Sequence, residues 1–154
     1  LRYFRFFIQY SKTDHNSQTI LAIKKYINGI NKISNERIYS EVNKILKIKN
    51  IYSLFSDNIS NEIILNIFPQ FKYYERLKNI NTLSDVVKNN YSAQLILSLL
   101  IIDQSNEYEY FCHKFKISNS IKDQMKNISK NFLNLKNKNF FSKENIKKKN
   151  LFIK

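Results

Sequence analysis

Glycine, proline, cysteine and methionine each occur once in this chain of 154 residues, and tryptophan does not occur. Proteins on average contain about 7% glycine and about 5% proline. Tight hairpins and phosphate-binding loops both need glycine, so a β-sandwich, a P-loop and a dinucleotide-binding fingerprint are poorly supported. A single cysteine and two histidines exclude a disulfide framework and an ordinary zinc site, and we assign no metal ligand to the chain.

Isoleucine, asparagine and lysine dominate the composition instead, with 23, 22 and 22 residues. Hydrophobic residues make up 43% of the chain, which is enough to bury a core in a protein of this length. The three abundant residues are encoded by A/T-rich codons, so genome composition explains part of the lysine content.

Positive charge gathers near the end of the chain. Residues 1–113 contain 14 basic and 10 acidic residues, whereas residues 114–154 contain twelve lysines against Asp123 and Glu144. A basic block of this kind is typical of a surface that binds polyanions, usually nucleic acid. The alternative is a solvated face whose lysines reflect genome bias alone.

No segment has the features of a membrane span or a targeting sequence. The most apolar run, 93–102, is about half the length that a bilayer requires, so it predicts a buried core helix. The first residues lack the pattern of a signal peptide. Because the only methionine is Met125, we expect that Leu1 is not the native start and that the chain is the C-terminal part of a longer protein.

Hydrophobic residues recur at helical spacing along most of the chain, and no segment has a convincing strand pattern. The sequence therefore predicts an all-α array or bundle of about seven to nine mostly short helices, without a β-sheet head. We expect a neck-like helical segment over 1–50, a body-like segment over 51–116, and a basic tail helix with a frayed lysine-rich end over 117–154. One of the short helices is expected over 83–88.

The first helix is expected to pack through an apolar stripe of Tyr3, Phe7 and Tyr10, which lie at i, i+4 and i+7. Arg2 and Arg5 lie on another face, three residues apart. Their spacing directs both guanidinium groups to the same side, which suits phosphate or base acceptors.

Helix ends are expected at four positions. Asp14 or Asn16 would cap the second helix, and Ser60 would cap a helix that Pro69 ends. Gly29 would take the left-handed conformation that commonly ends a helix.

The last predicted helix carries the candidate polyanion surface. Lys122, Lys126 and Lys130 recur every four residues and form a basic face beside its apolar stripe. Further along, Lys147, Lys148 and Lys149 form a basic run that would be a disordered arm or a second contact. Lysine provides a point charge that suits phosphate without base specificity.

Four segments together carry a family resemblance. Residues 1–7 have the sequence Leu-Arg-Tyr-Phe-Arg-Phe-Phe, and 34–38 have Ser-Asn-Glu-Arg-Ile, followed by Glu41. Later come Ile-Phe-Pro at 67–69 and Lys-Ile-Ser-Asn at 116–119. In this order and spacing they resemble the neck, body and tail of class II CCA-adding enzymes, the tRNA nucleotidyltransferases of the poly(A) polymerase family.

The resemblance implies an activity that this chain would not perform alone. Such enzymes add C, C and A to the 3′ end of tRNA from CTP and ATP, and we expect a cytoplasmic location. Their N-terminal head binds two Mg²⁺ ions on an Asp-x-Asp pair, and that head is missing here. The chain would thus be a tRNA-binding, all-helical part that assists the nucleotide site and binds no cofactor by itself. These residues do not separate CCA addition from poly(A) addition.

The resemblance also implies roles for individual residues. Arg2 and Arg5 match neck arginines that approach the nucleotide, and the lysine-rich end matches a tail that contacts the tRNA backbone. Glu36 and Arg37 match a motif that supports the base-reading turn. The alternative for Arg37 is an i, i+4 ion pair with Glu41.

Other chemistry and other functions remain as alternatives. Cys112 is expected in the core with His113 at the surface, since neighbours on a helix point about 100° apart. The acids Asp103, Glu107 and Glu109 are expected in a solvated loop.

The second functional hypothesis is a free-standing basic helical module that binds RNA or DNA, and the third is a structural interaction protein.

Overall fold

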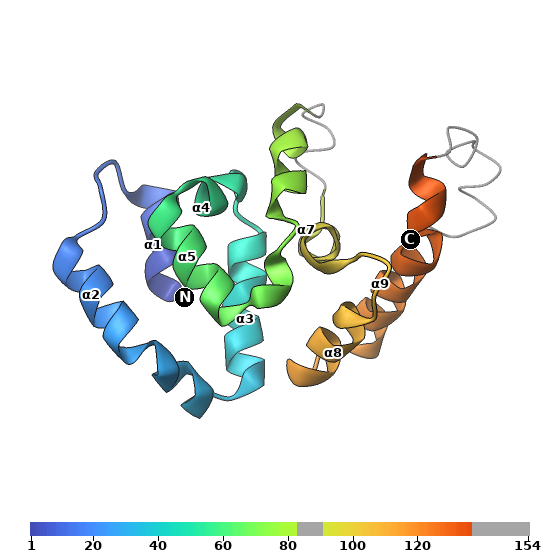
Figure 1. The fold of residues 1–154 in the computed structure, drawn as a ribbon, viewed down its shortest axis with the longest axis horizontal. Coiled ribbons are helices and arrows are strands. Elements are labelled where there is room, and N and C mark those ends of the chain that lie inside the picture. The colour runs from blue at the N-terminus through green and yellow to red at the C-terminus, as the bar shows by residue number, and fades with distance from the viewer. Residues whose placement is uncertain (83–90, 137–154) are drawn as a thin grey trace.

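The computed structural model describes residues 1–82 and 91–136, and all regular structure in these ranges is helical (Figure 1). The prediction of an all-α array is therefore confirmed, with no strand among the described residues. The N-terminal part contains α1 (Arg2–Tyr10), α2 (Ser17–Tyr26), the 3-10 helix η1 (Ile27–Lys32), α3 (Asn35–Leu46), α4 (Tyr52–Ser56) and α5 (Asn58–Ile67). The remainder contains the 3-10 helices η2 (Pro69–Phe71) and η3 (Tyr74–Thr82), then α7 (Ala93–Ile101), α8 (Glu107–Lys114), α9 (Asn119–Asn131) and the 3-10 helix η4 (Phe132–Lys136). The helix expected over 83–88 lies outside the described residues.

Helix α7 forms the centre of the molecule, with α2 and α9 at opposite ends (Figure 1). It packs against α3, η2, η3, α8 and α9. Most of its nine residues are buried, namely Ala93, Ile96, Leu97, Ser98, Leu100 and Ile101. The apolar run is thus the buried core helix that its length predicts. No helix in the two described ranges combines the length and apolarity that crossing a bilayer requires.

The predicted helix starts are partly correct. The side chain of Asn16 caps α2, accepting a hydrogen bond from the Thr19 N–H at 3.0 Å. Ser60, by contrast, is not a cap but is buried inside α5. Asp57 caps that helix, accepting from the Ser60 N–H at 2.7 Å. Asp57 takes this role because it has an extended backbone directly before the first helical residue, Asn58, so its side chain reaches the N–H three residues further on.

Gly29 does not end a helix in the left-handed conformation, so that prediction is wrong. The chain continues from α2 into η1, and the φ angle of Gly29 is not positive. The helical turn simply tightens there, which needs no special glycine geometry. Among the described residues, positive φ occurs at Lys116 (φ 50°), where the chain turns from α8 into α9.

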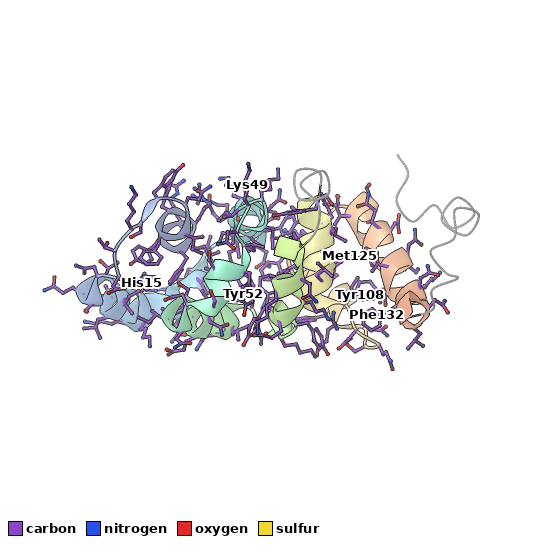
Figure 2. The ribbon with its side chains drawn as sticks, turned by 90° about the horizontal axis from the view of Figure 1, so that it is seen from above. His15, Lys49, Tyr52, Tyr108, Met125 and Phe132 are labelled. Atoms are coloured by element: carbon purple, nitrogen blue, oxygen red, sulfur yellow. The ribbon has the colours of Figure 1, made fainter. Side chains whose placement is uncertain are left out.

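A sulfur contact joins α8 to α9, and a cation–π contact joins η3 to η4. Cys112 Sγ lies 3.7 Å from Met125 Sδ, and both residues are buried. Tyr108, Met125 and Phe132 lie at the same end of the molecule (Figure 2). The guanidinium of Arg76 lies 5.2 Å from the ring centroid of Phe132.

The same Arg76 also satisfies the C-terminal end of α7. Its Nη1 donates to the carbonyl oxygens of Leu99 and Ile102, at 3.1 and 2.6 Å. The last carbonyls of a helix have no partner within the helix, so a cation placed there stabilises the end. Arg76 is therefore a structural arginine.

Candidate functional site

A cleft of about 720 Å³ opens between α1, the α2–η1 segment and α3. Its apolar lining includes Phe4, Ile23, Ile27, Ile30, Ile33, Ile38 and Ile67. The charged residues along it are Arg2, Arg37 and Lys44 against Glu41. We call this feature the α1–α3 cleft. Cations around an apolar lining suit a ligand that combines a planar or apolar body with negative charge.

The two sequence segments that resemble the CCA-adding neck lie side by side along this cleft. The Nε of Arg5 in α1 donates to Glu41 Oε2 in α3 at 3.3 Å, across 36 residues of sequence. Lys44 Nζ donates to Glu41 Oε1 at 2.7 Å. The Lys44 hydrogen bond, with the charges of Lys44, Arg5 and Arg2, lowers the pKa of Glu41 despite its partial burial. Glu41 is thus ionised at neutral pH and fastens α1 to α3.

Arg2 and Arg5 lie in different surroundings. Arg2 is exposed on the cleft, and within the described ranges it forms no hydrogen bond or ion pair. Arg5 is half-buried against Glu41, with its guanidinium carbon 4.4 Å from the ring centroid of Phe6. Only Arg2 is free to meet a ligand without breaking an internal contact, while Arg5 has an intramolecular partner at its Nε.

Glu36 and Arg37 also point in different directions. Glu36 pairs with Lys116 Nζ at 2.5 Å, which connects the start of α3 to the turn between α8 and α9. The hydrogen bond from Lys116 lowers the pKa of Glu36. Arg37 is exposed and lines the α1–α3 cleft. The expected ion pair between Arg37 and Glu41 does not form, because Arg5 and Lys44 occupy the Glu41 carboxylate.

The lysines of the last helix form a second, separate surface. Lys126 and Lys130 are exposed, and Lys122 is half-buried beside them. Met125, three residues after Lys122, is buried, so Lys122 lies at the edge of the core while Lys126 and Lys130 face away from it. We call these three residues the α9 lysine face. Figure 1 places it at the far end of the molecule from α2, whereas Lys147, Lys148 and Lys149 lie outside the described residues.

Sequence reasoning missed His15, which lies after α1 (Figure 2) and contacts both α1 and the start of α5. Its side chain is 3% exposed, with Nε2 at 2.8 Å from Asp57 Oδ2 and Nδ1 at 2.9 Å from the Tyr3 hydroxyl. The imidazole also stacks on Phe7, with ring centroids 3.6 Å apart. His15 stands alone between polar residues in the sequence, so no local pattern reveals these contacts.

The His15 cluster does not have the geometry of a catalytic triad. The Ser60 hydroxyl lies 3.2 Å from the same Nε2 that meets Asp57, whereas a triad places serine and carboxylate on opposite ring nitrogens. Ser60 is also fully buried, out of reach of a substrate. The cluster therefore holds α1 and the following loop onto the start of α5.

Replacing Asp57 with alanine is expected to lower the free energy of unfolding by about 1–2 kcal/mol, because it removes a helix cap and a hydrogen bond to His15. Burial raises the pKa of Asp57, but hydrogen bonds from Ser60 and His15 outweigh it and the pKa is lowered. The stabilisation is thus present above the unfolded pKa, about 3.8, and is lost as the pH falls through the lower folded value. Urea denaturation from pH 7 to pH 2 measures the difference between Asp57→Ala and wild type, which should shrink at acid pH. Asp14→Ala, in the same loop, should stay within about 0.5 kcal/mol of wild type, and an equal loss there would contradict the prediction.

The remaining candidates for chemistry are structural. Cys112 is buried and His113 exposed, as predicted, and burial raises the pKa of the Cys112 thiol to about 11. A thiol of that pKa is a poor nucleophile at neutral pH. The expectation of a solvated loop for the three acids is wrong: Glu107 and Glu109 lie in the first turn of α8 and are partly buried, as is Asp103, and Lys72 Nζ lies 3.5 Å from Asp103 and 3.0 Å from Glu107. In 1–82 and 91–136, no three His, Cys, Asp or Glu residues gather as metal ligands would.

Comparison with known proteins gives one finding about function. Residues 16–75, from the α2 cap into η3, match a family model described as the probable RNA and SrmB-binding site of polymerase A. Searches of characterised proteins and of solved structures returned no match. The matched range contains Glu36, Arg37 and Glu41. The chain thus contains a region similar to the probable RNA-binding site of polymerase A.

Proposed function

We propose that this chain is the RNA-binding C-terminal part of a CCA tRNA nucleotidyltransferase, which extends tRNA 3′ ends using CTP and ATP. In this proposal a separate catalytic head binds Mg²⁺, and no residue of this chain is a metal ligand. The chain binds tRNA and completes the nucleotide site, but it does not catalyse transfer alone.

One observation carries the proposal. The two neck-like segments, α1 and the start of α3, converge on one cleft, where Arg2 and Arg37 stand exposed. The hydrogen bond between Arg5 and Glu41 holds these segments together. The family match over residues 16–75 supports an RNA-binding role independently of this geometry.

The cleft residues have complementary roles in this proposal. The exposed guanidinium of Arg2 would bind a nucleotide phosphate with paired N–H groups, which Arg does better than Lys. Arg5, positioned by Glu41, would add positive charge beside it. Glu36 would act as a positioning residue, because its ion pair with Lys116 fixes the start of α3, from which Arg37 reaches the cleft.

The α9 lysine face would bind the tRNA backbone at a distance from the nucleotide. Its lysines are spaced one helical turn apart, about 6 Å, which is close to the phosphate spacing along one RNA strand. This surface also favours the second candidate, a basic module that binds any nucleic acid, since backbone contacts carry no sequence information.

Fluorescence anisotropy with labelled tRNA and with an RNA duplex of equal length tests the proposal. We expect tighter binding to tRNA, with an affinity that falls steeply as salt rises from about 50 to about 200 mM. Equal binding to any polyanion would favour the basic module. Absence of binding near physiological salt would contradict an RNA-binding function.

A further inference from the structure

Helix α1 carries two pairs of stacked aromatic rings, one facing inward and one facing outward. On the inner side, Tyr3 stacks on Phe7 with ring centroids 5.9 Å apart, and Phe7 stacks in turn on His15. On the outer side, Phe6 stacks on Tyr10 at the same distance, 5.9 Å, with the ring planes 29° apart. A third ring stacks on the inner pair. Within the described ranges, no third ring stacks on the outer pair.

The outer pair is unusually open for two large rings. Phe6 is 44% exposed and Tyr10 is 71% exposed. The expectation that Tyr10 belongs to the buried stripe of α1 is therefore wrong: Phe4 takes the core position, and it is 1% exposed. Burying two such rings against a partner would remove a large apolar area from water.

The charges around the outer pair favour an anionic partner. Arg2 lies one helical turn before Phe6 on the same side of α1, and the Arg5 guanidinium lies over the Phe6 ring at 4.4 Å. The sequence of α1 contains no acid. Glu41, an acid of α3 that contacts the helix, already pairs with Arg5 and Lys44.

We propose that Phe6 and Tyr10 form a stacking surface for the single-stranded 3′ end of the RNA, with the positive charge of Arg5 over the Phe6 ring attracting the RNA backbone, while Arg2 binds the nucleotide. Nucleobases stack on aromatic side chains whatever their identity, and a neighbouring cation binds the phosphates. This inference rests on the proposed function. Nucleotide addition forms a bond between the RNA 3′ hydroxyl and the nucleotide α-phosphate and releases pyrophosphate. The 3′ end must therefore lie next to the nucleotide, and α1 carries both surfaces.

Binding of two RNA hairpins measures the contribution of the stacking surface. One hairpin ends bluntly and the other carries a single-stranded 3′ extension of about four nucleotides. Wild type should bind the extended hairpin more tightly, and Phe6→Ala combined with Tyr10→Ala should reduce that affinity roughly tenfold or more. The blunt hairpin should bind both proteins alike. The conservative pair Phe6→Tyr and Tyr10→Phe should retain the preference.

Tyr110→Ala provides a matched control. Tyr110 is 58% exposed on α8, so it resembles Tyr10 in type and exposure, and Lys114 Nζ lies 5.9 Å from its ring centroid, a cation beside the ring as Arg5 is beside Phe6. Its loss should leave binding of the extended hairpin unchanged. An equal loss with Tyr110→Ala would contradict a specific role for α1.

Ultraviolet crosslinking tests the same contact in the unaltered protein. Trypsin cuts after Arg5 and Lys12 and releases residues 6–12, which contain both rings. The extended hairpin should crosslink to this peptide and the blunt hairpin should not. Unchanged affinity of the double alanine variant, or crosslinks elsewhere only, would show that this surface meets something other than RNA. The proposed function would survive that result, whereas failure of the wild type to bind either hairpin would count against the proposed function itself.

Discussion

Charge reversal of the α9 lysine face, by Lys122→Glu, Lys126→Glu and Lys130→Glu together, is expected to weaken tRNA binding by about 100-fold or more near physiological salt. Each phosphate contact contributes a factor of roughly five at that salt concentration, because binding releases a condensed counterion. Three lost contacts multiply to about that value, and the introduced carboxylates repel the backbone further. Fluorescence anisotropy across a salt series measures both the affinity and its salt dependence.

The salt dependence separates backbone contacts from a general loss of fold. The slope of log affinity against log salt should become shallower by about 2–3 if three phosphate contacts are lost. Lys→Arg at the same three positions preserves the charge and should bind almost as wild type does. Because Lys122 is half-buried, the exposed pair Lys126→Glu and Lys130→Glu provides a second variant with little risk to folding. Unchanged affinity and slope in both reversal variants would contradict the tail assignment.

Replacing Phe111 with alanine is expected to lower the free energy of unfolding by about 3–5 kcal/mol. Phe111 is fully buried, and its ring centroid lies 4.5 Å from that of Phe115 and 5.7 Å from that of Phe71. The two partners come from the end of α8 and from η2, so the ring joins segments that are distant in sequence. Its removal leaves a cavity that the surrounding helices cannot fully close. The loss is large, because the total free energy of unfolding of a domain is only about 5–15 kcal/mol.

Urea denaturation followed by circular dichroism measures the cost of the Phe111 substitution. Tyr110→Ala, at the adjacent position but exposed, should change stability by no more than about 0.5 kcal/mol. Similar losses at the two positions would show that α8 contributes through helix formation and not through packing of one ring. A loss below about 1 kcal/mol for Phe111→Ala would contradict the placement of the ring in the core.

The candidate site could be predicted from the sequence only in part. The spacing of the three α9 lysines predicts one helix face, and Lys126 and Lys130 are indeed exposed on it. The same kind of reasoning gives Arg2 and Arg5 equivalent roles, yet Glu41 occupies the Nε of Arg5 and leaves Arg2 exposed. Helical spacing predicts which residues lie on the same side of one helix. It does not predict which residue of another helix will contact them.

The sequence by itself determined the class of fold and the local helix signals. The scarcity of glycine and proline, the apolar run of α7 and the Asn16 cap all act within a few residues, so they can be identified along the chain. Tertiary structure alone decided which side of α1 faces the core: Phe4 is buried and Tyr10 is exposed. It likewise decided the pairs that join distant segments: His15 with Asp57, Arg5 with Glu41, and Lys116 with Glu36. Such pairs depend on how whole helices pack against one another, and the free energy of that packing comes from apolar burial throughout the molecule and not from the few residues that meet.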